Sequence, residues 1–381
     1  MIRQLLVPLF LLLTVFYCRS QQPSHYIIGK EELSGLDIYD LYQDKRLNYW
    51  IATNDGLYKY DGYVFEKIAS EAIANSSIFG FKADREGGIY CFNLKGQIFK
   101  INEEETDLYF QLPDSLLNSS LTYEFDHDNK MIVATRSIIR VNENGSFDEI
   151  YVNTDGTLSP LFREKNGDLI CFNRSEKTEV RITTEGVKSH SVVGDLPKGV
   201  TPHFVHFMGH KVGYSAENGH LLSALSYKRF QESPDSWPVL LEGGTNRFYP
   251  AGKDLWVASM AGGIRIWNPH NKQFSDTFFK SNIVSSFLVD NEGNCLLGTF
   301  GEGIIVVPNR NVLDLVFENN EPKITQITAS REGMVFLGAQ DGRLFRVEKN
   351  KLPQELDRPV YKHVETLGFI EEMNSLLLNE K

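Results

Sequence analysis

A unit of about 40 residues recurs along this chain, and it constrains the fold more than any other feature of the sequence. Equivalent positions in successive copies are Trp50, Tyr90, Ile132, Ile170, Gly213, Trp256, Leu296, Phe336 and Leu376. The intervals between them run from 38 to 43 residues, and chance does not produce eight such intervals with the same internal pattern. This self-similarity indicates an architecture in which each copy packs against its neighbours.

Each copy shows the same order of strands and turns. A polar turn rich in Asp, Glu, Gly and Asn precedes a buried strand such as "YWIAT" (49–53) or "VFLGA" (335–339). A tight turn containing Gly follows, for example Asp55-Gly56 or Asp341-Gly342, because hairpin turns need positive φ. No stretch has helical periodicity over more than a few turns. The chain is therefore predicted to be all-β.

Four antiparallel strands in about 40 residues are typical of the blade of a β-propeller, in which neighbouring blades cover one another's apolar faces. The copies predict a ring of seven blades over residues 21–310, which "HYIIG" (25–29) closes by adding an outer strand to the last blade. Residues 311–381 would then hold further repeats that begin a second propeller. An eight-bladed ring is the alternative. Because the last copy stops inside a strand, we expect the chain to be the N-terminal part of a longer protein.

The first 20 residues have the pattern of a signal peptide. Arg3 precedes an apolar run from Leu5 to Tyr17, which is too short to span a bilayer but suits a signal-peptide core. Cleavage near Ser20 is predicted. The alternative is a lipoprotein with Cys18 as the lipidated residue, although Phe16 and Tyr17 are bulky for that motif. The sequence therefore predicts export from the cytoplasm, to the periplasm or another extracytoplasmic place.

The charge of the chain argues against nucleic acid as a partner. It carries 39 basic and 50 acidic residues, a net charge of −11, and nucleic-acid phosphates require a basic surface. The global field also disfavours strongly anionic ligands, although a local basic pocket could still bind one. After cleavage, Cys91, Cys171 and Cys295 remain, each within a predicted strand. An odd number of widely spaced cysteines indicates core packing rather than a disulfide framework.

The segment "IYDLYQDKRLNYWIATNDGLYKYDGYVF" (38–65) resembles the two-component regulator propeller repeat. The features that carry this resemblance are "QD" (43–44), "WIAT" (50–53), "GL" (56–57) and "YDG" (60–62), with further matches at 256–264 and 298–304. The resemblance implies the extracytoplasmic sensor region of a membrane histidine kinase, as found in Bacteroidetes. It also implies a small ligand such as an oligosaccharide, a cognate histidine kinase region and a setting in which homodimers occur. This chain contains no kinase motif, so any kinase activity would lie in a missing C-terminal part.

The sequence offers no catalytic motif, cofactor loop or metal site. "GTFGEG" (298–303) lies at a repeat turn with no helix after it, so it is interpreted as a hairpin turn. His203, His206 and His210 fall on a predicted strand, where side chains alternate between faces, so they do not converge on a metal. Recurrent acids such as Asp44, Asp126 and Asp290 are interpreted as turn residues that bond to the local backbone.

Ligand binding is predicted on the face that carries the turns between second and third strands and the segments entering first strands. The candidate residues are Asn54, Asp55, Arg136, His203, Glu217, Asn218, Asn246, Arg247, Asn282, Phe300 and Gln340. Their variation from copy to copy suits an asymmetric ligand, although each is also compatible with an ordinary solvated turn. The predicted function is ligand sensing without enzyme activity. A secreted propeller lyase or glycosidase and a protein-interaction scaffold are the alternatives.

Overall fold

The computed structural model describes residues 22–68, 77–102, 105–117, 121–153, 158–173, 175–176, 178–191, 202–207, 210–215, 221–223, 245–259, 261–268, 273–315, 317, 322–348, 353–356, 364–370 and 375–380. The chain divides into two compact units. One, the ring unit, runs from His25 to Pro308, and the other, the C-terminal unit, combines the residues up to Ser24 with those from Asn309 onward. Among the described residues the only helical element is a 3-10 turn, η1 (Asp114–Leu116), so the all-β prediction is confirmed.

The described strands of the ring unit form seven consecutive groups. The first three are β3 (Ser34–Gln43), β4 (Tyr49–Thr53), β5 (Gly56–Tyr60) and β6 (Phe65–Lys67); β7 (Ile78–Ala83), β8 (Ile89–Asn93), β9 (Gln97–Ile101) and β10 (Thr106–Gln111); and β11 (Thr122–Phe125), β12 (Met131–Ala134), β13 (Ile138–Val141) and β14 (Phe147–Tyr151). The fourth and fifth are β15 (Phe162–Arg163), β16 (Leu169–Asn173), β17 (Thr178–Thr183) and β18 (Gly186–Ser191), then β19 (Pro202–Phe207), β20 (His210–Ser215) and β21 (Leu221–Ser223). The last two are β22 (Thr245–Ala251), β23 (Asp254–Ser259), β24 (Ile264–Asn268) and β25 (Gln273–Phe274), then β26 (Val284–Val289), β27 (Cys295–Glu302) and β28 (Ile304–Val307).

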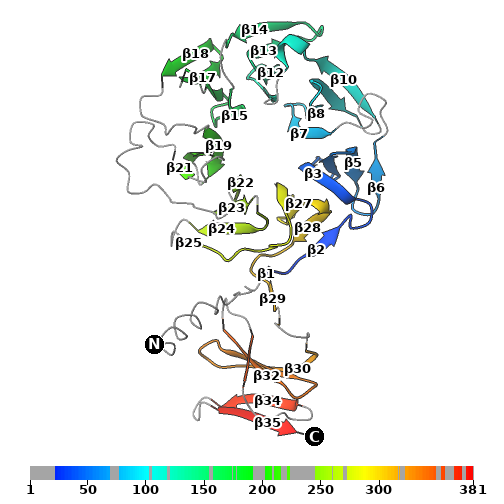
Figure 1. The fold of residues 1–381 in the computed structure, drawn as a ribbon, viewed down its shortest axis with the longest axis vertical. Coiled ribbons are helices and arrows are strands. Elements are labelled where there is room, and N and C mark those ends of the chain that lie inside the picture. The colour runs from blue at the N-terminus through cyan, green and yellow to red at the C-terminus, as the bar shows by residue number, and fades with distance from the viewer. Residues whose placement is uncertain are drawn as a thin grey trace, which may run out of the picture. The chain divides into compact units, whose positions relative to one another are not determined.

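These groups follow one another around a common centre, with β3, β7, β15 and β22 nearest to it (Figure 1). The strand nearest the centre is the first of its group, and the later strands lie progressively further out. Within each group, consecutive strands pair antiparallel, for example Trp50 with Tyr42 on one side and Lys59 on the other. The predicted repeat unit of four antiparallel strands is thus confirmed in copies one to four and six.

An early strand completes the last group. β2 (Tyr26–Ile28) pairs with β28 in the register Tyr26 to Val306 and Ile28 to Ile304. β27 also extends past its own sheet and pairs with β3, with Phe300 opposite Asp37. The outer strand expected from residues 25–29 therefore forms where it was predicted. Closure into seven blades over residues 21–310 stays a prediction, which this pairing supports.

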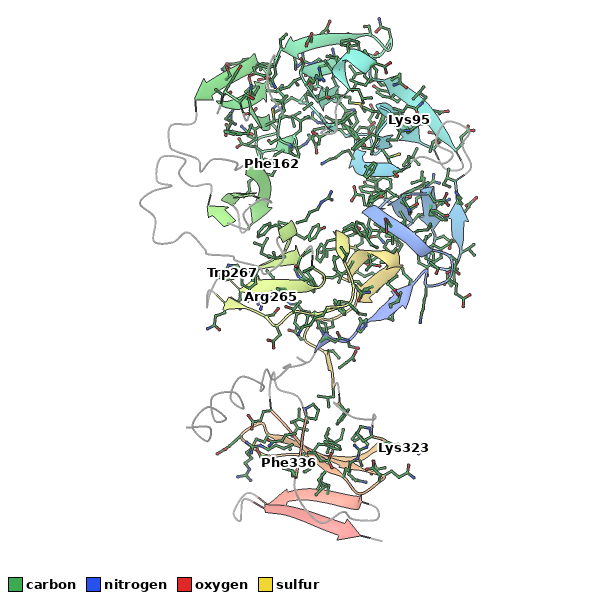
Figure 2. All side chains as sticks on the ribbon, in the orientation of Figure 1. Lys95, Phe162, Arg265, Trp267, Lys323 and Phe336 are labelled. Atoms are coloured by element: carbon green, nitrogen blue, oxygen red, sulfur yellow. The ribbon has the colours of Figure 1, made fainter. Side chains whose placement is uncertain are left out.

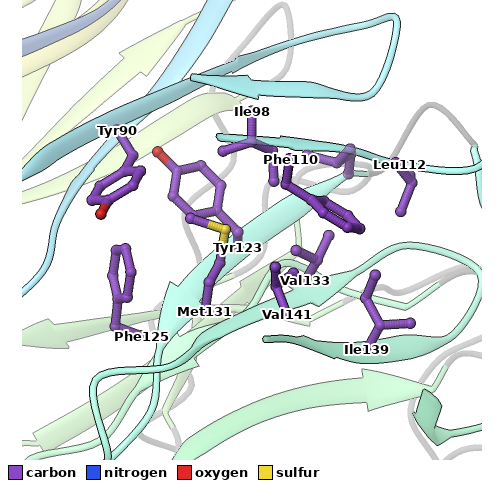
Figure 3. Packing of buried hydrophobic residues seen from close by; sticks show 11 residues of the cluster. Tyr90, Ile98, Phe110, Leu112, Tyr123, Phe125, Met131, Val133, Ile139 and Val141 are labelled. Carbon is purple, nitrogen blue, oxygen red and sulfur yellow. The ribbon is translucent and has the colours of Figure 1, made fainter. Parts of the chain in front are cut away.

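Apolar side chains fill the space between consecutive sheets (Figure 2). Figure 3 shows one such layer between the second and third sheets, where Ile98, Tyr123 and Met131 are at most 2% exposed. Because successive residues of a strand point to opposite faces of the sheet, a sheet can contribute to two such layers, as the second sheet does with Phe99 on one side and Ile98 on the other. Each fully buried large side chain stabilises the ring by about 1.5–3 kcal/mol. Cys91 and Cys171 are also buried here, as expected for core packing, and burial raises the pKa of the Cys171 thiol to about 12.

The turn acids Asp44, Asp126 and Asp290 bond to their own backbone, as predicted. Asp44 Oδ1 accepts the N–H groups of Arg46 and Asn48 at 2.8 and 2.9 Å. Asp126 and Asp290 do the same in their copies. The residue three positions after the turn acid adopts positive φ. This conformation is strained for Leu47 (φ 70°), because it has a side chain, but not for the equivalent Gly87 and Gly167.

The C-terminal unit also consists of strands. β1 (Gln22–Pro23) pairs with β29 (Leu313–Asp314). A four-stranded sheet contains β30 (Ile324–Ala329), β31 (Val335–Ala339), β32 (Leu344–Val347) and β33 (Gln354–Glu355), and a hairpin contains β34 (Val364–Ile370) and β35 (Ser375–Glu380). The eighth copy therefore forms a sheet like those of the ring unit. Assignment of residues 311–381 to a second propeller stays a prediction.

Candidate functional site

Three aromatic side chains meet at the inner strands of the ring unit. Tyr39 of β3 stacks on Phe79 of β7, with ring centroids 4.5 Å apart and an interplanar angle of 21°. Phe300 of β27 meets Tyr39 edge to face at 6.1 Å, and it is 37% exposed. Tyr39 and Phe79 are partly buried. We call these three residues the inner aromatic surface.

β-Bulges explain how these side chains reach that place. The pairing of β3 with β4 shifts register between Ile38 and Asp40, so Tyr39 is the extra residue. The corresponding shift in β7 follows Phe79. A bulge bends a strand and re-aims a side chain, and here it turns residues of the innermost strands away from the layers between sheets. Gly80, in the β7 bulge, has φ 62°, and a Cβ there would lie 2.5 Å from the ring of Phe92.

A half-buried carboxyl group, that of Asp40, lies next to the inner aromatic surface. Asp40 Oδ2 accepts the backbone N–H of Phe81 in the neighbouring sheet at 2.7 Å, and Oδ1 accepts the N–H of Leu41 at 2.9 Å. Withdrawal from solvent raises the pKa of Asp40, while the positive charges of Arg247 and Lys82 act in the opposite direction. Arg247, on β22, is exposed. The site therefore offers one exposed cation, Arg247, and one acid with a raised pKa, Asp40.

Inner-strand hydrogen bonds connect one sheet to the next and make the site rigid. The hydroxyl of Tyr249 donates to Ser285 O at 2.8 Å, and Ser285 Oγ donates to Ile38 O. Further round the ring, the Tyr123 hydroxyl donates to Gly80 O at 2.8 Å. Because these bonds hold the bulged strands, the inner aromatic surface is largely preformed.

The structure brings three of the predicted residues together. Asn54 Oδ1 accepts the N–H of Asp37, the residue opposite Phe300 in the sheet. The N–H of Phe300 donates to Ile283 O, next to Asn282, at 3.1 Å. Asn54, Asn282 and Phe300 therefore lie along one edge where the first and last sheets meet.

The remaining predicted residues are placed differently. Asp55 forms an ion pair with Lys67 of the outer strand β6 at 2.6 Å, and this hydrogen bond lowers the pKa of Asp55. Arg136 is exposed on the β12–β13 turn, and Gln340 belongs to the C-terminal unit. The backbones of His203 and Asn246 lie in β19 and β22, but their side chains lie outside the described residues, as do Glu217 and Asn218.

Tyr39, Phe79 and Asp40 were not among the binding residues predicted from the sequence. Those predictions covered turns and the segments that enter first strands, whereas these three residues lie within inner strands. The signal was present in "DIYDLYQD" (37–44), where Tyr39 and Asp40 interrupt the alternation of an apolar strand. That interruption marks the bulge.

Comparison with known proteins places the fold but not the family. No family model and no curated protein matches the sequence. The extracellular domain of the putative hybrid two-component system BT3049 from B. thetaiotaomicron has TM-score 0.62 and 15% identity, over 90% of this chain and 50% of that one. The corresponding domain of BT4673 has TM-score 0.55 and 14% identity, over 94% of this chain and 51% of that one. Virginiamycin B lyase from Staphylococcus aureus has TM-score 0.55 and 13% identity, over 75% of this chain and 98% of that one.

The fold of this chain is a β-propeller. At these identities the similarity shows the fold alone, and the chain spans about half the length of the two extracellular domains. Within the described part of the propeller, no three His, Cys, Asp or Glu side chains are placed to hold a metal ion. No helix of the described residues is long and apolar enough to cross a membrane.

Proposed function

We propose that this propeller is the extracytoplasmic ligand-sensing part of a two-component signal-transduction system, and that it binds a small glycan fragment at the inner aromatic surface. The observation that carries the proposal is the contact of Tyr39 with Phe79 and with Phe300, in which Phe300 is exposed and the other two rings are partly buried. Ligand sites are mostly apolar, with a few polar groups that set orientation, and Arg247 and Asn282 supply such groups near this surface.

The chemistry of the surface suits a sugar. An aromatic ring has a negative face, which attracts the weakly positive C–H groups on one side of a pyranose. The hydroxyl groups on the sugar's edge would then bond to Arg247 and to the polar residues of the rim. No nucleophile or pair of exposed acids is needed for this role.

The proposed partner is a histidine kinase region that this chain does not contain. Support comes from the fold neighbours, two of which are extracellular domains of putative hybrid two-component systems, and from the signal peptide that the sequence of residues 1–20 predicts. Signalling requires that the ligand binds one of two states of the receptor more tightly, and a homodimer would offer such states. The proposed location is the periplasm or the cell exterior.

A thermal-shift screen of the mature chain with neutral oligosaccharides tests the proposal. A ligand present at 100 times its Kd adds about 2.7 kcal/mol of stability, which a melting curve resolves. Phe300→Ala should weaken that ligand up to about tenfold, whereas Tyr63→Ala, at a side chain that is 92% exposed, should not. Absence of any stabilising sugar, or equal binding by Phe300→Ala, would contradict the proposal.

A propeller lyase is the second candidate, because virginiamycin B lyase has the same fold. It would place catalytic groups at the centre of the ring, where Asp40 is the acid with raised pKa. Cleavage of a polysaccharide panel by the wild type, and loss of that cleavage in Asp40→Asn, would favour it. A protein-interaction scaffold would instead capture a partner without stabilisation by any small ligand.

A further inference from the structure

A cavity of about 380 Å³ lies at the Gln43 end of β3, beside the turn that leads to β4. It opens between the β3–β4 turn of the first sheet and the β7–β8 turn of the second. Lys45, Arg46, Lys59 and Trp50 line it from the first sheet, and Gly87 is among the residues that line it from the second. Its volume falls within the ~300–1,000 Å³ of ordinary ligand pockets.

The cavity is locally basic in a chain whose net charge is −11. Three cationic side chains line it, against the single carboxylate of Asp44. Both oxygens of that carboxylate already accept hydrogen bonds within the first sheet. Oδ1 bonds the turn backbone, and Oδ2 accepts from Asn48 Nδ2 and Trp50 Nε1, each at 3.0 Å. The carboxylate of Asp44 is therefore held in place by bonds within the first sheet.

The protein contains an internal comparison for this cavity. The third sheet's His127 corresponds in the repeat to Lys45, and the fourth sheet's Gly167 corresponds to Gly87. The contacts correspond too. A Cβ on Gly167 would lie 2.6 Å from the His127 ring, and a Cβ on Gly87 would lie 2.8 Å from Lys45 Nζ. In both junctions a cationic or titratable side chain thus reaches from one turn onto the next.

The two junctions differ at the following residue. After Gly167 comes Asp168, whose carboxylate bonds His127 Nε2 at 3.1 Å and Arg181 at 3.2 Å. After Gly87 comes Gly88, which has no side chain. The second sheet therefore lacks the carboxylate that the fourth sheet places beside the preceding turn, and the basic cavity is found at this junction.

We propose that this cavity binds the carboxylate of a small molecule, in the place that the Asp168 carboxylate takes in the third junction. Lys45 and Lys59 supply the positive charge, and charge-assisted hydrogen bonds to a carboxylate are stronger than neutral ones. The site is distinct from the inner aromatic surface, because none of Tyr39, Phe79 and Phe300 lines the cavity.

Isothermal titration of the mature chain with D-glucuronate, and with D-glucose as its neutral counterpart, tests the proposal. Glucuronate should bind and glucose should not, and binding should weaken as salt rises because the pocket charges are partly exposed. Lys45→Gln and Lys59→Gln should each weaken glucuronate by at least about tenfold.

Lys67→Gln is the matched control. Lys67 lies over the Tyr58 ring at 5.8 Å as Lys59 lies over Trp50 at 5.8 Å, but it is not among the residues that line this cavity. It should bind glucuronate like the wild type, and so should Phe300→Ala, which separates this site from the inner aromatic surface. Equal binding of glucose and glucuronate, or unchanged affinity in both Lys45→Gln and Lys59→Gln, would overturn the proposal.

Discussion

Two junctions between neighbouring sheets place different residues at the same repeat positions. In the third junction, between the third and fourth sheets, His127, Asp168 and Arg181 form a connected network. Arg181 also pairs with Glu164 and with Glu179. In the first junction, between the first and second sheets, Gly88 replaces the central acid and a cavity lies between the turns. The comparison shows that the repeat fixes the backbone, while a few positions decide whether a junction is filled by the protein's own charges.

Replacing Arg181, which contacts three acids in the third junction, should have the largest effect on the free energy of unfolding. Arg181→Met leaves Glu179, with a side chain only 4% exposed, and Glu164 without their guanidinium partner, so the free energy of unfolding should fall by about 2–3 kcal/mol. Lys100→Met changes the corresponding residue of the second sheet and should cost less than about 1 kcal/mol. Urea unfolding followed by fluorescence measures both. Equal losses would show that the two junctions do not differ in this way.

In the first junction, a substitution at Trp50 measures how much the bond between its indole N–H and Asp44 contributes to stability. Its indole N–H bonds Asp44, whereas the equivalent Tyr90 uses its hydroxyl to bond Asp84 at 3.2 Å. Trp50→Phe loses both the bond and buried volume, so we expect a loss of about 2 kcal/mol. Trp50→Tyr should recover about half of that loss in the same unfolding assay. If the two variants are equally unstable, the bond to Asp44 contributes little.

The order of strands and turns in the repeat could be predicted from the sequence, whereas the bulges of the inner strands and the contacts between copies could not. The period, the turn acids and the closing strand at 25–29 follow from local rules that act in every copy. Asn54, Asn282 and Phe300 were proposed because they occupy recurrent turn and entry positions, and their role in binding stays a prediction. Tyr39, Phe79 and Asp40 were missed because a bulge changes which way a side chain faces without changing composition. The cavity beside Lys45 depends on contacts between copies, which no single copy reveals.

The pH dependence of stability should also separate the two junctions. Burial alone would raise the pKa of Asp168, but hydrogen bonds from His127, Asn166 and Arg181 prevail and lower it. Because the pKa of Asp168 is lower in the folded chain than in the unfolded chain, the unfolded chain binds a proton on this carboxylate first as the pH falls. The stabilisation is therefore present above pH ~4 and is lost as the pH falls further. Asp168→Asn should reduce this acid-dependent loss by at most about 0.7 kcal/mol, measured by urea unfolding at pH 7 and pH 3.5. An unchanged pH profile would mean that Asp168 gains nothing from its partners.

Gly88→Asp converts the first junction toward the third and should have the smallest effect on stability. Its new Cβ would lie 2.7 Å from Asp84 Oδ2, so that carboxylate must shift, and the shift opposes the gain from a new pair with Lys45. The net change in the free energy of unfolding should stay within about 1 kcal/mol. Glucuronate binding should be lost nonetheless, because the introduced carboxylate neutralises the cations of the cavity.

Gly88→Asn imposes nearly the same steric change without the charge, so it is the matched control for that substitution. It should retain most of the glucuronate affinity, while Gly88→Asp should lower it by at least about tenfold. Titration calorimetry on both folded variants makes the comparison. If the two variants bind equally well, charge at this position does not control the cavity. The analogy between Gly88 and Asp168 would then hold for the backbone only. If only the charged variant fails, the empty place beside Lys45 is the place of a ligand's carboxylate.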